Sequence, residues 1–115
     1  MKKFDVGIYS GRFLPSCKDY VDYIDTVAKE CRLAYIIISY DSKQEERIHP
    51  VIKRMKELHK ITYHYRNVIP IILNVSSNWE ARMLEYCESA EVIYNDQSNQ
   101  IDYSKIYPNI KHIDF

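Results

Sequence analysis

Short apolar runs of strand length alternate with helical patterns along this chain, and this alternation limits its fold more than any other feature. The runs are rich in Ile, Val and Tyr, which favour strands, and three helical patterns separate the first four runs from one another. Strands that alternate with helices form βαβ units, in which the strands are parallel and the helices pack on the sheet. The runs are Phe4–Tyr9, Leu33–Tyr40, Val68–Leu73, Ala90–Tyr94 and Ile110–Phe115.

We therefore predict a single three-layer, Rossmann-like α/β domain over residues 1–115, with a mostly parallel five-stranded sheet. The continuous run from Leu33 to Ile38 predicts a strand that is covered on both faces. Pro50 either begins a fresh first turn of the second helix or kinks it. Residues 96–110 are polar, without a strong helical face, and predict a loop or a short helix. Three predicted capping boxes begin at Ser16, Ser42 and Ser77.

Charge and composition exclude several classes of partner. The net charge is zero and the pI is about 6.9, so no overall field attracts nucleic acid or an anionic membrane. No apolar run approaches the roughly 20 residues of a membrane span, and the N-terminus lacks the apolar core of a signal peptide. Cys17, Cys31 and Cys87 are too widely spaced for a disulfide framework or a zinc pattern, so we expect a reducing cytoplasm.

Two groups of side chains have an ordinary structural interpretation. The chain contains 11 tyrosines, and we expect their amphipathic rings to lie at the rim of the core. The second helix carries four basic residues balanced by nearby glutamates, which predicts a solvated, salt-bridged face. These basic residues are Lys53, Arg54, Lys56 and Lys60.

The two glycines of the chain, Gly7 and Gly11, lie close to the point where the first apolar run gives way to a helical pattern. Glycine at a strand-to-helix turn lets the backbone approach a ligand, and the following helix directs N–H groups at anions, an arrangement that suits a phosphate. In parallel α/β sheets, ligands bind outside the carboxyl ends of the strands where the strand order reverses. Asp41 and Asp96 follow other predicted strands; capping a turn is favoured for them over contact with ribose or Mg²⁺.

The segment Gly11-Arg12-Phe13-Leu14-Pro15 resembles the Gly-Arg-Phe-x-Pro opening of the cytidylyltransferase-like nucleotidyltransferase superfamily, most closely its nicotinamide-mononucleotide adenylyltransferases. In that family the opening runs into His-x-Gly-His, whose histidines bind nucleotide phosphates. This chain has Cys17-Lys18-Asp19-Tyr20 in its place, so both histidines and the glycine are replaced. Glu46-Arg47 resembles the Glu-Arg that opens the second helix of the family.

The resemblance implies a nucleotidyltransferase-like protein that binds a nucleotide or a nucleotide-activated small molecule. Loss of two imidazole donors predicts weak or no transfer to a phosphorylated acceptor, with Mg²⁺ required only if the protein is active. A homodimer is expected by analogy with the family. The alternative is a non-catalytic regulatory or assembly module that uses the crevice for a protein partner. The predicted catalytic residues are Lys18 and Tyr20, and the predicted nucleotide- or phosphate-binding residues are Ser10, Gly11, Arg12, Phe13, Cys17 and Arg47.

Cys17 has two further interpretations. A thiol at a helix N-terminus beside Lys18 is expected to be more reactive than free cysteine, which would suit a nucleophilic or redox-sensing role. Burial as a small apolar side chain is the commoner fate of a single cysteine.

Overall fold

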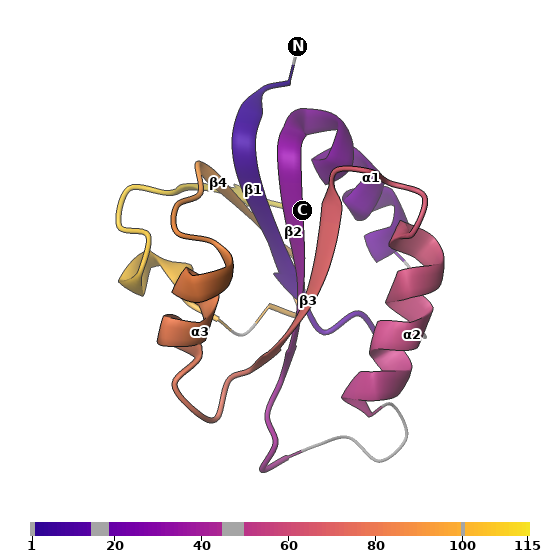
Figure 1. Cartoon of the computed structure of the whole chain (residues 1–115), viewed down its shortest axis with the longest axis vertical. Coiled ribbons are helices and arrows are strands. Elements are labelled where there is room, and N and C mark those ends of the chain that lie inside the picture. The colour runs from indigo at the N-terminus through magenta and orange to yellow at the C-terminus, as the bar shows by residue number, and fades with distance from the viewer. Residues whose placement is uncertain (1, 15–18, 45–49, 100) are drawn as a thin grey trace.

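The computed structural model describes residues 2–14, 19–44, 50–99 and 101–115, which form a three-layer α/β domain (Figure 1). Its elements occur in the order that the sequence predicts. They are β1 (Phe4–Gly11), α1 (Tyr20–Glu30), β2 (Cys31–Tyr40), α2 (Val51–Thr62), β3 (Val68–Asn74), α3 (Trp79–Tyr86), β4 (Val92–Asn95), a 3₁₀ helix η1 (Tyr103–Lys105) and β5 (Lys111–Asp114).

The sheet has five strands in the order β3-β2-β1-β4-β5, and all four pairings are parallel. This confirms the predicted Rossmann-like fold. β2 and β3 lie on one side of β1, and β4 and β5 lie on the other, so the strand order reverses between β1 and β4. α1 and α2 cover one face, whereas α3 and the C-terminal segment around η1 lie over the other (Figure 1).

Each face of the sheet has its own apolar core, and β2 contributes to both. Ile36 and Ile38 pack in the core beneath α1 and α2, while Ile37 packs in the core with Met83 of α3 and Tyr103 of η1. Successive side chains of a strand point to opposite faces, which explains why the predicted run is apolar without interruption.

The predicted helix caps are less accurate than the predicted helices. α2 begins at Val51 with Pro50 in an extended conformation before it, so Pro50 precedes a fresh first turn and Ser42 does not cap this helix. Asn78, in a left-handed conformation and without a side-chain cap hydrogen bond, precedes α3 in place of the predicted Ser77. Ser16 lies outside the described residues.

The expectation that tyrosines lie at the rim of the core is wrong for several of them. Tyr9, Tyr94 and Tyr103 are among the most completely buried side chains of the described residues. Their rings fill the core, and a buried phenol needs a hydrogen-bond partner inside the protein. The hydroxyls donate as follows: Tyr9 to Asp96, Tyr94 to Glu30, Tyr103 to Ser10, Tyr65 to Asp25 and Tyr107 to the carbonyl of Cys87.

Gly7 and Gly11 both lie within β1 rather than in the turn after it, and neither has a positive φ. Each makes room for a neighbouring side chain. A Cβ at Gly7 would overlap Cys31 Sγ and lie 3.1 Å from Val92 Cγ1, whereas a Cβ at Gly11 would lie 2.8 Å from Ser98 Oγ. The expectation that they lie in a strand-to-helix turn is therefore wrong, and the lack of a side chain at each allows close packing against β2, β4 and the loop after β4.

Gly7→Ala should lower the free energy of unfolding by about 1–3 kcal/mol, because the added methyl group overpacks the core between Cys31 and Val92. Urea denaturation measures this change. Cys31→Ala removes the sulfur that the added methyl group would overlap. The double variant should therefore lose less free energy of unfolding than the sum of the losses of the two single variants. Strictly additive losses would contradict this packing account.

Candidate functional site

A cavity of about 260 Å³ lies outside the carboxyl ends of β1 and β4, where the strand order reverses. Ligands of open α/β sheets bind at this position. Its wall combines aromatic and apolar side chains with a smaller polar part. The apolar lining residues are Phe13, Leu14, Tyr20, Tyr23 and Phe115, and the polar ones are Asp19, Asp96, Gln97 and Ser98.

Asp96 is fixed by three hydrogen bonds at the end of β4. Its Oδ1 accepts from the Ser98 N–H at 2.8 Å and from Ser98 Oγ at 2.6 Å, and its Oδ2 accepts from the Tyr9 hydroxyl at 2.5 Å. Burial, with a further contribution from the Asp96 bond, raises the pKa of Tyr9, so this phenol remains a donor. Asp41 likewise accepts from the Lys43 N–H, and these bonds confirm the turn role predicted for both aspartates.

The turn after β1 is bound to two other segments through Arg12. The Arg12 N–H donates to Ser98 Oγ at 3.0 Å, and the Arg12 carbonyl accepts from Arg54 Nη1 at 2.8 Å. Phe13 follows with φ of 53°, a left-handed conformation that is rare for an aromatic residue. The described part of the turn is thus held in one conformation by side chains from the β4 loop and from α2.

Arg54 corrects the predicted basic face of α2. Lys53, Lys56 and Lys60 are exposed as expected, but Arg54 is only 2% exposed and donates to the carbonyls of Arg12 and Ser39. Its position was the missed signal, since Arg54 precedes the buried Leu58 by four residues, which places it on the apolar stripe of the helix.

The predicted site residues divide into four groups. Phe13 and Tyr20 line the cavity; they are 3% and 4% exposed, and their rings pack edge to face at 5.3 Å. Burial raises the pKa of Tyr20, which favours its neutral form. Ser10 and Gly11 face other protein atoms: Ser10 Oγ accepts from the Tyr103 hydroxyl, and Gly11 packs against Ser98. Arg12 is half-buried, and its backbone N–H and carbonyl form the hydrogen bonds to Ser98 and Arg54. Outside the described residues lie Cys17, Lys18 and Arg47.

Two aromatic residues of the cavity were not predicted. Tyr23 and Phe115 stack with their ring centroids 4.1 Å apart and their planes 5° from parallel. The Phe115 N–H donates to the carbonyl of Asn95, which places its ring beside the end of β4. Tyr23 follows Tyr20 by three residues on α1, a spacing that could have indicated a shared face. Nothing local to Phe115 indicated that it would reach the site.

Two carboxylates, Asp19 and Asp96, are the charged side chains that the described residues contribute to the cavity lining. Within the same described ranges, no three His, Cys, Asp or Glu side chains come together in a way that could hold a metal ion. Nor is any described helix both long enough and apolar enough to cross a lipid bilayer.

Comparison with known proteins identifies a structural relative. A scan of protein-family models and a search of curated proteins each find no match. Among solved structures, the NadR protein in complex with NAD and AMP-PNP matches with a TM-score of 0.68 and 15% identity; the similarity covers all of this chain and 38% of that one. The chain therefore has the Rossmann-like α/β fold seen in NadR, and at this identity the similarity is one of fold.

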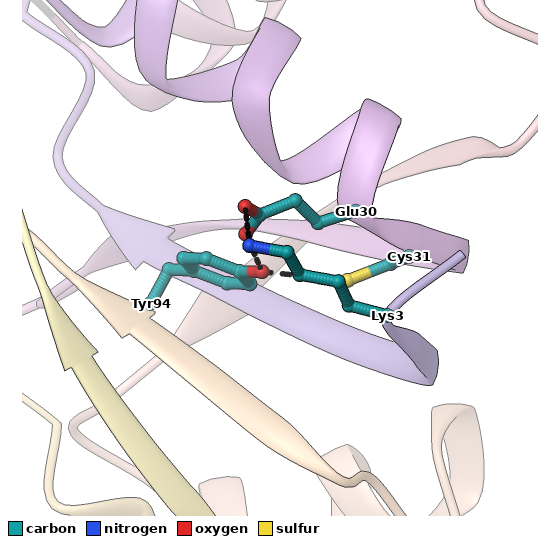
Figure 2. Close-up of polar contacts among 4 residues, drawn as sticks. All are labelled: Lys3, Glu30, Cys31 and Tyr94. Atoms are coloured by element: carbon teal, nitrogen blue, oxygen red, sulfur yellow. Dashed lines mark hydrogen bonds and ion pairs between the residues drawn. The ribbon is translucent and has the colours of Figure 1, made fainter. Parts of the chain in front are cut away.

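A second polar cluster forms where α1 ends and β2 begins, and it contains Lys3, Glu30, Cys31 and Tyr94 (Figure 2). The Tyr94 hydroxyl donates to Glu30 Oε1 at 2.5 Å and lies 4.0 Å from Cys31 Sγ, while Lys3 Nζ lies 3.2 Å from Glu30 Oε2. Burial raises the pKa of Cys31 to about 11, so its thiol stays protonated and unreactive. Cys31 and Cys87 are both buried and belong to the apolar cores of the two faces of the sheet.

The Tyr94 bond is expected to make stability depend on pH. It lowers the pKa of Glu30 below the ordinary value of 4.5, with a smaller contribution from Lys3. A carboxyl group whose pKa is lower in the folded chain than in the unfolded chain stabilises the fold at pH values above the unfolded-state pKa. This stabilisation is lost as the pH falls through the folded-state pKa. Tyr94→Phe should therefore flatten the decrease in unfolding free energy between neutral pH and about pH 3.

Urea denaturation across this pH range tests the prediction, with the exposed Tyr63→Phe as the matched control. Identical pH slopes for the wild type and Tyr94→Phe would contradict it.

Proposed function

We propose that this chain is a nucleotidyltransferase-like protein whose cavity binds the nucleoside part of a nucleotide or of a nucleotide-activated small molecule. The observation that carries the proposal is an aromatic cavity at the ends of β1 and β4, where the strand order reverses. NadR, which has a similar fold, was crystallised with NAD and AMP-PNP, and this supports the choice of ligand class.

The wall of the cavity suits a base and a ribose. The rings of Tyr23 and Phe115 are aligned with each other and border the space, and base–aromatic stacking contributes about 1–3 kcal/mol per base. Asp96, Gln97 and Ser98 bring hydrogen-bonding groups to the same wall. A cavity of about 260 Å³ is slightly below the roughly 300–1,000 Å³ of drug-sized sites, which fits one nucleoside rather than a dinucleotide.

In this proposal the phosphates extend toward the predicted residues of the turn after β1. Arg12, Lys18 and Arg47 are the cations proposed to contact them. Mg²⁺ is proposed only for an active protein, since it is held in nucleotide sites by one or two carboxylates together with substrate phosphates. Asp19 is the cavity carboxylate that would hold it, because both oxygens of Asp96 already accept hydrogen bonds from Ser98 and Tyr9. Bound Mg²⁺ would neutralise phosphate charge that the cavity carboxylates otherwise repel.

Transfer activity is proposed to be weak or absent. Cys17 and Tyr20 stand where the resemblance places phosphate-binding histidines. Tyr20 is buried and its pKa is raised, so its phenol offers one neutral donor and no positive charge. Loss of an oxyanion-stabilising donor costs roughly 2.7–4 kcal/mol in comparable sites. Lys18 and Tyr20 are the residues proposed to support any residual reaction.

The second candidate function is that of an assembly module whose crevice takes a protein partner. The burial of Phe13 and Tyr20 favours it, because their packed rings occupy part of the space beside the turn. Absence of binding for every nucleotide and nucleoside tested would favour this alternative.

Tyr23→Ala should weaken binding of ATP, CTP or adenosine by about 10-fold or more, because it removes one stacking ring of the cavity. Isothermal titration calorimetry with and without Mg²⁺ measures the affinities. Tyr86→Ala is the matched control, since Tyr86 is an exposed tyrosine of α3 outside the cavity lining. If the wild-type chain binds none of the three ligands, the proposed function is wrong.

The chain should release little or no pyrophosphate from ATP or CTP with Mg²⁺ and nicotinamide mononucleotide as acceptor. The physical reason is that Cys17 and Tyr20 stand in place of the two histidine donors of the family motif. A coupled pyrophosphate assay measures the rate. Turnover in the usual enzyme range of about 1–10³ s⁻¹ would contradict the proposed degeneracy.

A further inference from the structure

Both backbone polar groups of Arg12 are held by side chains from distant segments. Ser98, in the loop after β4, accepts from the Arg12 N–H, and Arg54, on α2, donates to the Arg12 carbonyl. We call Ser98 and Arg54 the Arg12 clamp. The same Arg54 nitrogen donates to the Ser39 carbonyl at 3.2 Å, so the clamp connects the turn after β1 with β2 as well as with the β4 loop.

The residue that follows the clamp carries backbone strain. Phe13 has φ of 53°, and a non-glycine residue keeps such a conformation only when its surroundings enforce it. Its ring packs edge to face on Tyr9 at 5.1 Å and on Tyr20 at 5.3 Å, and it forms part of the cavity wall. Fixing the peptide group before Phe13 restricts where this ring can lie.

The other half of the clamp is part of the cavity wall itself. Ser98 lines the cavity and donates through both its N–H and its hydroxyl to Asp96. The hydroxyl oxygen that accepts from Arg12 is therefore held by the carboxylate that also accepts from Tyr9. The β1 and β4 walls are joined through this one chain of hydrogen bonds.

We propose that Ser98 and Arg54 are positioning residues that hold Arg12 and Phe13 so that the cavity is preformed before a ligand enters. The part of this inference that concerns ligand affinity rests on the proposed nucleotide-binding function. A preformed site binds more tightly because less ordering is needed on association. Without the clamp, Phe13 can relax from its left-handed conformation and its ring can leave the wall.

Ser98→Ala tests the β4 half of the clamp. Hydrogen exchange of the unliganded chain should show about 2- to 10-fold faster exchange at the Arg12 amide, and the affinity for adenosine and ATP should fall by a similar factor. Amides in the centre of β2 should keep their rates. Ser104→Ala is the matched control, because Ser104 donates to Asp102 as Ser98 does to Asp96 but lies outside the cavity lining.

Arg54→Lys and Arg54→Met test the α2 half, with the exposed Lys53→Met as control. Methionine leaves the Arg12 and Ser39 carbonyls without this donor, whereas lysine keeps a cationic donor but lacks the planar guanidinium fork. We expect the backbone chemical shifts of Phe13 to move away from left-handed values, and affinity to fall further for methionine than for lysine. If Arg54→Met fails to fold, Arg54→Lys alone decides this half.

Unchanged Arg12 exchange in Ser98→Ala, or unchanged Phe13 shifts in a folded Arg54 variant, would overturn the proposal. Faster exchange with unaltered affinity would also overturn it, since the clamp would then not serve binding. A wild-type chain that binds neither adenosine nor ATP would instead refute the proposed function, and the exchange and shift measurements would still decide whether the clamp holds the turn.

Discussion

Burial of the central strand on both faces is the constraint on which the rest of the structure depends. β1 lies between β2 and β4, with Ile8 in the core beneath α3 and Tyr9 in the core beneath α1 and α2. Polar atoms on such a strand cannot reach water, so they need partners within the protein. Ser10 meets Tyr103 on one face, and Tyr9 meets Asp96 at the end of β4.

The same constraint places the cavity. The connections leave β1 and β4 in opposite directions because neighbouring strands are added on opposite sides, and this leaves space between the two loops. Hydrogen bonds from Tyr9 and Ser98 to Asp96, and from Arg12 to Ser98, then hold these loops at a fixed separation. A site of this kind owes its shape to links between loops more than to either loop alone.

Much of the architecture was predictable because its signals are local. The run Leu33–Ile38 indicated a strand covered on both faces, and the helical stripe around Leu58 indicated α2. Arg54 lies on that stripe and is buried, although its charge predicted a solvated face. Helix starts were harder, because the extended Pro50 and the left-handed Asn78 replace the predicted serine caps.

The candidate site was predictable in location and less so in composition. A parallel α/β pattern fixes the edge of the sheet where a ligand binds, so the order of residues alone associates Phe13 and Tyr20 with that edge. Phe115 could not be associated with it in this way, because its place depends on the pairing of β5 with β4, and it lies 20 residues of chain beyond the end of β4. Cys17, Lys18 and Arg47, which were also predicted as site residues, lie outside the described part of the chain.

The sequence by itself determined the order of strands and helices, the parallel sheet and the edge at which a site would form, because apolar periodicity and chain connectivity are local properties. Only the tertiary structure decided that the buried tyrosines Tyr9, Tyr94 and Tyr103 donate to Asp96, Glu30 and Ser10. It also decided that Arg54 supports the turn after β1 and that Phe115 borders the cavity. These contacts join residues tens of positions apart, and side-chain geometry at such separations is set by packing rather than by any local pattern.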